Sequence, residues 1–278
     1  MQLSRGMSPI ASAPAAILDK ESRDFYRHAL GLLDKENLPY LVGGAYAFAR
    51  YTGIERHTKD FDIFIRRSDF PRAAKILGRA GYETDLSFPH WLGKAFKGES
   101  FIDLIFSAGN GVATVDDLWF KYAVPGRVLD MEVKLIPAEE MIWSKGLIME
   151  RERYDGADVA HVIYALGDKL DWRRLIDRYA EYWRALYAHL ILFGFIYPSH
   201  RSKIPTSVMD EMAQRLSAET RLGNGKEKIC YGTILSRQQY LVDVDDRGYK
   251  DARQQPEGNM NAEEIAHWTA GIDQDGSK

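Results

Sequence analysis

The chain has 278 residues, 45% of them hydrophobic and 28% charged, as in a globular protein that buries a substantial core. Its formal net charge of −3 excludes a strongly basic surface overall, so a polyanion would have to be bound by a local basic patch. Cys230 is the only cysteine, which excludes an intramolecular disulfide and a zinc site built from several thiolates.

The sequence gives no indication of export or of a membrane span. Its first residues, M-Q-L-S-R-G-M-S-P, lack the apolar stretch of a secretory signal. The longest apolar run, 188–197, is interrupted by His189 and Gly194 and is shorter than the ~20 residues that cross a bilayer. We therefore expect a cytoplasmic protein that has no membrane partner.

Hydrophobic patterning predicts three regions with limits at 1–136, 137–197 and 198–278. The first region mixes short strands with helices. Its predicted elements are a helix over 20–35, a strand over 40–42, a helix from 44 to about 53, a strand over 61–65, a helix ending at 81, and a hairpin of strands 91–97 and 101–106.

The second region is predicted to be helical, and the third to be a linker followed by a short extension. A helix is expected after Pro137, and residues 172–190 carry apolar and aromatic side chains at helical spacing, which is typical of a packed face. Residues 198–228 are more polar and are predicted to be a linker or a loosely packed helix. Two short helical patterns follow in 229–272, and the tail 273–278 is predicted to be disordered.

Two aspartates stand inside the apolar strand D-F-D-I-F-I. Side chains two positions apart point to the same face of a strand, so Asp60 and Asp62 project together, about 7 Å apart at the backbone, while Phe61 and Ile63 fill the core. Converging carboxylates repel each other and favour a divalent cation, and oxygen ligands suit Mg²⁺. The alternative is a polar sheet edge or an ion pair with Lys59 or Arg66.

Asp103 and the pair Gly43-Gly44 extend this pattern. Asp103 is a single acid in the apolar strand F-I-D-L-I-F, and a neighbouring strand would bring it beside the first two carboxylates; the alternative is an ion pair with a lysine. A strand, two glycines and a helix in that order expose backbone N–H groups and a helix N-terminus to an anion. Together these residues predict a site for Mg²⁺ and a nucleoside triphosphate.

These residues resemble the nucleotidyltransferase superfamily that includes DNA polymerase β. The spacing of Gly43-Gly44, Arg56-His57 and Asp60-Phe61-Asp62, followed by a separate Asp103, is similar to aminoglycoside and lincosamide nucleotidyltransferases and to abortive-infection toxin nucleotidyltransferases. The resemblance covers residues 38–106 well and extends loosely to about 165. It implies an α+β fold with a mixed sheet flanked by helices, followed by a helical C-terminal domain.

The resemblance also implies roles for individual residues. Asp60, Asp62 and Asp103 would be catalytic and would hold two Mg²⁺ ions, with Mn²⁺ as the alternative ion. Asp103 would activate the acceptor hydroxyl, and Gly43 and Gly44 would line the phosphates of a bound NTP such as ATP. The other expected nucleotide or acceptor contacts are Arg56, His57, Lys145 and Arg153, and Asp155 and Asp158 are expected to line the cleft.

The sequence leaves the acceptor open. A resistance enzyme would modify a small molecule, whereas a toxin would modify tRNA or protein and would have an antitoxin partner. The near-neutral charge mildly disfavours a large polyanionic acceptor. A different class of protein, a non-catalytic nucleotide-sensing or interaction module that keeps the fold, is the alternative function. The base preference and the oligomeric state are not indicated by any pattern in the sequence.

Overall fold

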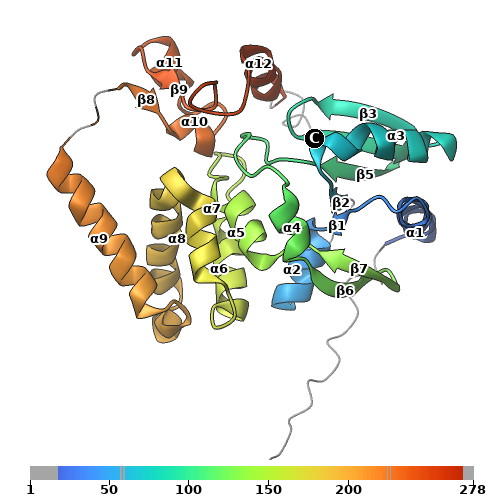
Figure 1. Cartoon of the computed structure of the whole chain (residues 1–278), viewed down its shortest axis with the longest axis horizontal. Helices are drawn as coiled ribbons and strands as arrows, with labels where there is room; N and C mark the ends of the chain where they lie inside the picture. Colours follow the sequence, from blue (N-terminus) through green and yellow to red (C-terminus); the bar gives the residue numbers. More distant parts are fainter. Residues whose placement is uncertain (1–17, 57, 59, 224, 226, 272–278) are drawn as a thin grey trace, which may run out of the picture.

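The computed structural model describes residues 18–56, 58, 60–223, 225 and 227–271. Figure 1 shows a sheet on one side of the molecule and a layer of helices on the other, with the last described segment running over the junction between them. No helix within these ranges has the length and apolar character needed to cross a membrane. The predicted tail 273–278 lies outside the described residues.

The main sheet has seven strands in the order β3-β4-β5-β2-β1-β7-β6. β2 runs parallel to β5, and β1 runs parallel to β7 but antiparallel to β2, so the sheet is mixed, as predicted. The strands are β1 (Leu41–Val42), β2 (Phe61–Phe64), β3 (Glu83–Phe88), β4 (Leu92–Lys97), β5 (Ser100–Ile105), β6 (Val124–Val128) and β7 (Met131–Leu135).

Helices pack beside this sheet and form most of the structure after residue 137. Two short parallel strands, β8 (Ile229–Cys230) and β9 (Lys250–Asp251), lie in the last part of the chain. The helices are α1 (Lys20–Lys35), α2 (Gly44–Thr52), α3 (Phe70–Arg79), α4 (Asp117–Lys121), α5 (Ala138–Gly146), α6 (Gly156–Leu166), α7 (Trp172–Tyr179), α8 (Trp183–Ile196), α9 (Thr206–Leu222), α10 (Gly232–Leu235), α11 (Leu241–Asp245) and α12 (Ala262–Ala270).

Local sequence signals explain where several helices begin and end. The Asp19 side chain accepts a hydrogen bond from the backbone N–H of Ser22 and caps α1. Gly53, in the left-handed conformation, ends α2. Asn261 and Glu264 form a reciprocal capping box at the start of α12. These helix ends are therefore fixed by side chains and glycines close to them in sequence.

The structure corrects the sequence predictions in two places and decides a third. The aromatic face over 172–190 is buried as expected, but a short 3₁₀ turn, Ala180–Tyr182, divides it between α7 and α8 because Ala180 adopts a positive φ of 41°. Within 198–228, predicted to be a linker or a loosely packed helix, residues 206–222 form the helix α9, in which Val208 and Met212 are the buried residues, so the second alternative is found. Strands β3, β6 and β7 were not predicted. The limits of the three regions remain a prediction.

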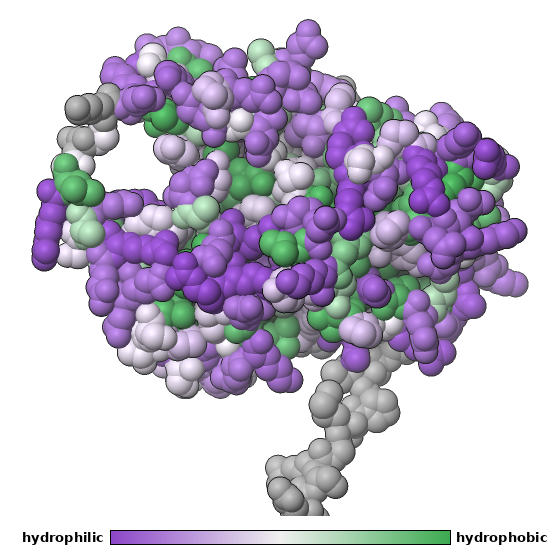
Figure 2. All heavy atoms as spheres, viewed as in Figure 1, coloured by the Kyte–Doolittle hydropathy of each residue, from purple (hydrophilic) through white to green (hydrophobic). Residues whose placement is uncertain are grey.

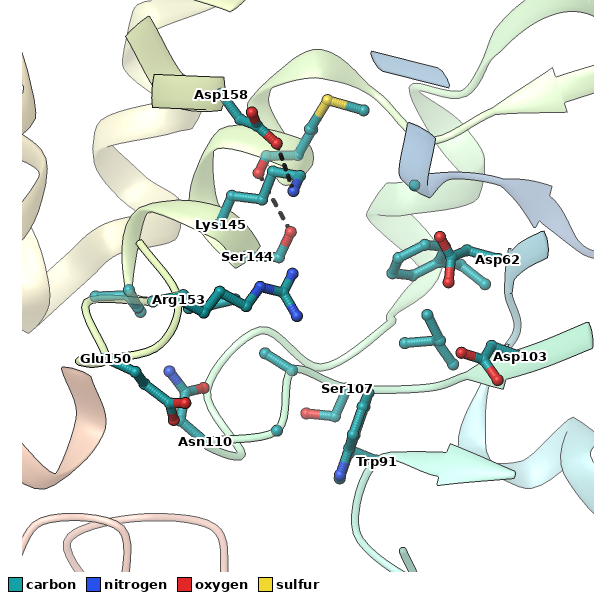
Figure 3. Close-up of a pocket in the computed structure, with 18 of the residues that line it drawn as sticks. Asp62, Trp91, Asp103, Ser107, Asn110, Ser144, Lys145, Glu150, Arg153 and Asp158 are labelled. Atoms are coloured by element: carbon teal, nitrogen blue, oxygen red, sulfur yellow. Dashed lines mark hydrogen bonds and ion pairs between the residues drawn. The ribbon is translucent and has the colours of Figure 1, made fainter. Parts of the chain in front are cut away.

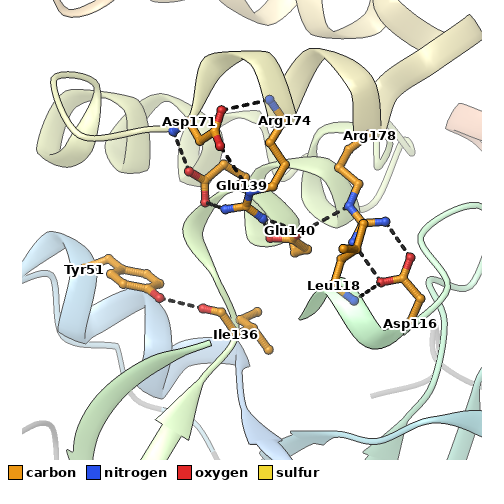
Figure 4. Close-up of polar contacts among 9 residues, drawn as sticks. All are labelled: Tyr51, Asp116, Leu118, Ile136, Glu139, Glu140, Asp171, Arg174 and Arg178. Carbon is orange, nitrogen blue, oxygen red and sulfur yellow. Dashed lines mark hydrogen bonds and ion pairs between the residues drawn. The ribbon is translucent and has the colours of Figure 1, made fainter. Parts of the chain in front are cut away.

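A buried network of charges joins the helical layer to the chain that leaves the sheet (Figure 4). Glu140 of α5 is fully buried and accepts hydrogen bonds from Arg174 at 2.6 Å and Arg178 at 3.1 Å. Arg178 also donates to both oxygens of Asp116, the N-cap of α4, at 2.6 and 2.8 Å. A buried carboxylate without such partners would be strongly destabilising, so this network fixes how α7 sits on α5 and α4.

Candidate functional site

Asp62 and Asp103 lie next to each other on the parallel strands β2 and β5. The two residues are paired in register, so their side chains leave the same face of the sheet. The alternation predicted for β2 is present, since Phe61 and Ile63 are buried whereas Asp60 is exposed and Asp62 half-buried. The structure therefore brings together two carboxylates, Asp62 and Asp103, that are 41 positions apart in sequence.

The carboxylates have an unfavourable electrostatic environment. Burial, reinforced by the negative charges of Asp103 and Asp60, raises the pKa of Asp62 to about 7. Burial also raises the pKa of Asp103, although an ion pair between Lys94 Nζ and Asp103 Oδ1 at 2.6 Å opposes that effect. The lysine partner considered for Asp103 at the outset is therefore present, but Arg66 pairs with Asp69 and Asp117 rather than with Asp60 or Asp62.

The backbone at residues 43 and 44 approaches β2 so closely that both positions require glycine. The N–H of Gly43 donates to the carbonyl oxygen of Asp62 at 3.0 Å. A Cβ atom on Gly43 would lie 2.2 Å from the ring of Phe64, and one on Gly44 would lie 1.7 Å from Asp62 Oδ2. Gly44 also has a positive φ of 52°. The N-terminus of α2 is thereby held directly against the Asp62 carboxylate.

Cationic side chains from the α5–α6 region face these carboxylates across a cavity (Figure 3). Lys145 Nζ lies 3.0 Å from Asp155 and 2.8 Å from Asp158. The Arg153 guanidinium donates to both oxygens of Asp155 at 3.0 and 2.8 Å, and Arg56 pairs with Asp158 at 2.5 Å. Burial would raise the pKa of Asp155, but Arg153 and Lys145 lower it to about 2. Three cations share two acids, which leaves net positive charge on this wall.

The cavity between the two walls has a volume of about 340 Å³. Most of the residues that the sequence predicted for the site line it. Gly43 does not line it directly, Asp155 lies behind Lys145 and Arg153, and His57 lies outside the described residues. The predicted residues that line the cavity are Gly44, Arg56, Asp60, Asp62, Asp103, Lys145, Arg153 and Asp158.

A third wall of the cavity was not assigned by sequence reasoning. We call residues 229–271 the C-terminal cap; they lie along the top of the view in Figure 1. The ring of Trp268 packs 5.2 Å from that of Trp91, and Arg237 lies over Trp268, 4.1 Å from its centroid. Trp91, Trp268 and Arg237 all line the cavity. Trp91 and Trp268 are far apart in the sequence, and no local pattern links them, so this wall could not be predicted from the sequence.

Polar contacts hold the C-terminal cap to the rest of the molecule. Asn110 Nδ2 donates to the carbonyl of Ile234 at 2.9 Å, and the N–H of Met149 donates to the carbonyl of Leu235 at 2.9 Å. Arg237 Nε lies 3.1 Å from Glu150 in a largely buried ion pair. The C-terminal cap therefore packs over the cavity and contributes Ile234, Leu235 and Arg237 to its lining. The face of the molecule that Figure 2 shows is mainly hydrophilic, and its hydrophobic residues form small groups.

The acidic wall suits a divalent cation in the chemistry of its donors. Within the described ranges, no group of three or more His, Cys, Asp or Glu side chains is already arranged to hold a metal ion. The two in-register carboxylates nevertheless offer hard oxygen donors on one face, with Asp60 at the rim. The raised pKa of Asp62 reflects burial first and then repulsion by Asp103 and Asp60, and a bound cation would relieve that repulsion. The residues present therefore fit Mg²⁺ or Mn²⁺.

Residues 26–193, more than half of the chain, match the model of a family described as an uncharacterised nucleotidyltransferase. No curated protein matches the sequence. Several solved structures resemble this one, and three of them are described here. The antibiotic-resistance factor ANT(2'')-Ia is 17% identical, with a TM-score of 0.42 over 62% of this chain and 96% of that one.

The second structure is a lincomycin-bound lincosamide antibiotic adenylyltransferase, which is 16% identical, with a TM-score of 0.37 over 51% of this chain and 96% of that one. The third is an antigenic nucleotidyltransferase-like protein from Paracoccidioides brasiliensis, which is 17% identical, with a TM-score of 0.44 over 67% of this chain and 95% of that one. At 16% or 17% identity, none of the three indicates what this chain acts on.

The raised pKa of Asp62 predicts that its charge destabilises the fold. The unfolded chain loses this proton near the ordinary value of 3.8 and the folded protein near 7, so the folded state binds more protons between these values. Stability should therefore fall as pH rises through that window. One pKa unit corresponds to about 1.4 kcal/mol, and after allowance for solvent screening we expect Asp62→Asn to raise the unfolding free energy by roughly 1–3 kcal/mol at pH 7.5.

Urea unfolding of metal-free protein at pH 4.5 and 7.5 measures this effect. Asp24→Asn, on the exposed face of α1, is the matched control and should change stability by less than about 0.5 kcal/mol. A loss of stability in Asp62→Asn at pH 7.5 would contradict the electrostatic account.

Two glycine substitutions separate backbone strain from the close approach at the site. Gly44 and Gly53 both have positive φ, but a Cβ on Gly53 would meet nothing within 4 Å. Gly53→Ala should cost about 1–2 kcal/mol, the price of a left-handed alanine, and leave ligand binding intact. Gly44→Ala should cost more and should weaken binding of Mn²⁺, measured by electron paramagnetic resonance, because Asp62 must move. Equal effects of the two substitutions on Mn²⁺ binding would refute this reading of Gly44.

Proposed function

This chain belongs to the family of uncharacterised nucleotidyltransferases, and from that premise we propose that it transfers a nucleoside monophosphate from an NTP to an acceptor hydroxyl with release of pyrophosphate. The observation that carries the proposal is the pairing of Asp62 with Asp103 opposite a cationic wall, across one cavity. An acidic wall that attracts metal and a basic wall that attracts phosphate are the two features that this reaction needs.

The triphosphate would lie between the N-terminus of α2 and the cationic wall. Lys145 and Arg153 are already oriented by Asp155, so little side-chain freedom is lost when a phosphate binds. The N-terminus of α2, which begins at Gly44 beside Asp62, adds backbone N–H groups that favour a bound anion. Arg56, anchored on Asp158 and stacked 4.3 Å over Phe48, stands farther along the same wall.

Asp60, Asp62 and Asp103 would hold Mg²⁺, or Mn²⁺ in its place. When bound, the ion polarises the phosphoryl oxygens and neutralises the charge that develops on the attacking and leaving oxygens. The protein's own carboxylates orient the acceptor: its hydroxyl oxygen forms the new bond to the α-phosphorus as the bond to the β-phosphate bridging oxygen breaks. Asp103 Oδ2, the oxygen that does not pair with Lys94, accepts the hydroxyl proton.

The acceptor would enter on the side of the C-terminal cap. Trp91 and Trp268 offer aromatic faces and edges there, and Arg237 is already neutralised by Glu150. A wall formed by the protein's own C-terminal residues restricts the room for a macromolecule, and the net charge of −3 gives no general attraction for tRNA. These features favour a small-molecule acceptor over tRNA or protein.

Pyrophosphate release tests the proposed reaction. With Mg²⁺, a panel of the four NTPs and pooled small-molecule metabolites as acceptors, the wild-type protein should release pyrophosphate. Asp62→Asn and Asp103→Asn should lower the rate by at least about a hundredfold, because each removes an expected metal ligand. Asp24→Asn serves as the folded control. Full turnover in either site variant would contradict the proposal, and tight Mg-NTP binding without turnover on any acceptor would favour the non-catalytic alternative.

A further inference from the structure

Lys94 occupies an unusual position beside the candidate metal site. It lies on β4 in register with Asp103 of β5, and its Nζ atom is 2.6 Å from Asp103 Oδ1. Both side chains are largely buried, with 24% of Lys94 and 14% of Asp103 exposed. The same Nζ lies 4.1 Å from the centroid of the Phe101 ring. Strand pairing therefore fixes an ammonium group against one of the three site carboxylates.

The three carboxylates differ in how they are neutralised. Within the part of the chain that the structure describes, Lys94 is the only cation in an ion pair with any of them, and Asp60 and Asp62 have none. Lys145 and Arg153 stand across the cavity, paired with Asp155. The Lys94 ammonium group is thus paired with Asp103 Oδ1. A divalent cation bound at this site would have to share this oxygen with the ammonium group or displace the ammonium group from it.

We propose that Lys94 is a built-in counter-ion of Asp103. A divalent cation that binds together with the nucleotide displaces the Lys94 ammonium group from Asp103. This inference rests on the metal site of the proposed function. In the free protein the ammonium group offsets part of the negative charge of the acidic wall, to which Asp60, Asp62 and Asp103 all contribute. Lys94 is therefore a positioning residue that keeps Asp103 in place and lowers the affinity of the site for a free metal ion.

The charges explain why the exchange would depend on nucleotide. A positive charge a few ångströms from a bound dication repels it, and partial burial weakens the screening of that repulsion. A bound triphosphate adds negative charge and oxygen ligands, which favours the metal over the lysine. The displaced ammonium group keeps a partner, because the face of Phe101 lies within cation–π distance of its present position. Metal and nucleotide would therefore bind cooperatively.

Mn²⁺ alone, titrated without nucleotide and followed by electron paramagnetic resonance, is the probe for this role. The variants are Lys94→Met, which removes the charge, and Lys94→Arg, which retains it. Lys97→Met on the same strand is the control, since Lys97 is exposed. We expect Lys94→Met to bind Mn²⁺ about tenfold more tightly than wild type, and Lys94→Arg and Lys97→Met to bind it within about twofold of wild type.

Adding a non-hydrolysable NTP provides the second readout. Wild type should gain Mn²⁺ affinity by a larger factor than Lys94→Met does, because the variant has no ammonium group to displace; a purely structural role for Lys94 would not produce this difference. Lys94→Gln gives the same reading should the methionine variant fail to fold. Unchanged or weaker Mn²⁺ binding in a folded, uncharged Lys94 variant would overturn the inference.

Two further variants distinguish this result from a failure of the proposed function. If Mn²⁺ binding is lost in Asp62→Asn and Asp103→Asn while Lys94→Met matches wild type, only the role of Lys94 is wrong. If Mn²⁺ binds equally well to both aspartate variants, the ion does not use these carboxylates, and the metal site and the inference are both overturned. Tighter binding in Lys94→Met that also requires both aspartates supports the inference.

Discussion

The parallel pairing of β2 with β5 is the constraint on which the rest of the site depends. It sets Asp62 beside Asp103 on one face of the sheet, and a shift of one residue would turn one carboxylate to the opposite face. The burial and repulsion that follow raise the pKa of Asp62 to about 7, so the fold maintains an unfavourable local arrangement. Such arrangements are typical of functional sites, where binding of a ligand relieves the strain.

The remaining walls complement this acidic pair. The network around Glu140 fixes the helical layer, which in turn holds Lys145 on the opposite side of the cavity. The C-terminal cap adds an aromatic wall with Trp268. Metal, phosphate and acceptor would thus be bound by three different parts of the fold: the sheet, the α5–α6 region and the cap.

The local part of this site could be predicted from sequence, and the long-range part could not. Alternation along 61–65 placed Asp60 and Asp62 correctly, and Gly43-Gly44 marked the strand-to-helix turn, because both patterns depend on neighbouring residues. Lys94 and Trp268 gave no such signal, since their roles arise from strand register and from packing across the chain. Strand β6 contains Pro125 and Gly126, which do not favour strands, whereas the apolar and polar residues of β7 alternate strictly over 131–135, a strand signal that went unused.

A crystal structure of the protein with Mg²⁺ and a non-hydrolysable NTP would test the central claim most directly. The account predicts metal bound by Asp62 and Asp103, the triphosphate lying against Gly44 and facing Lys145, and Lys94 Nζ no longer bonded to Asp103. A nucleotide bound outside this cavity, or metal held without either aspartate, would contradict it.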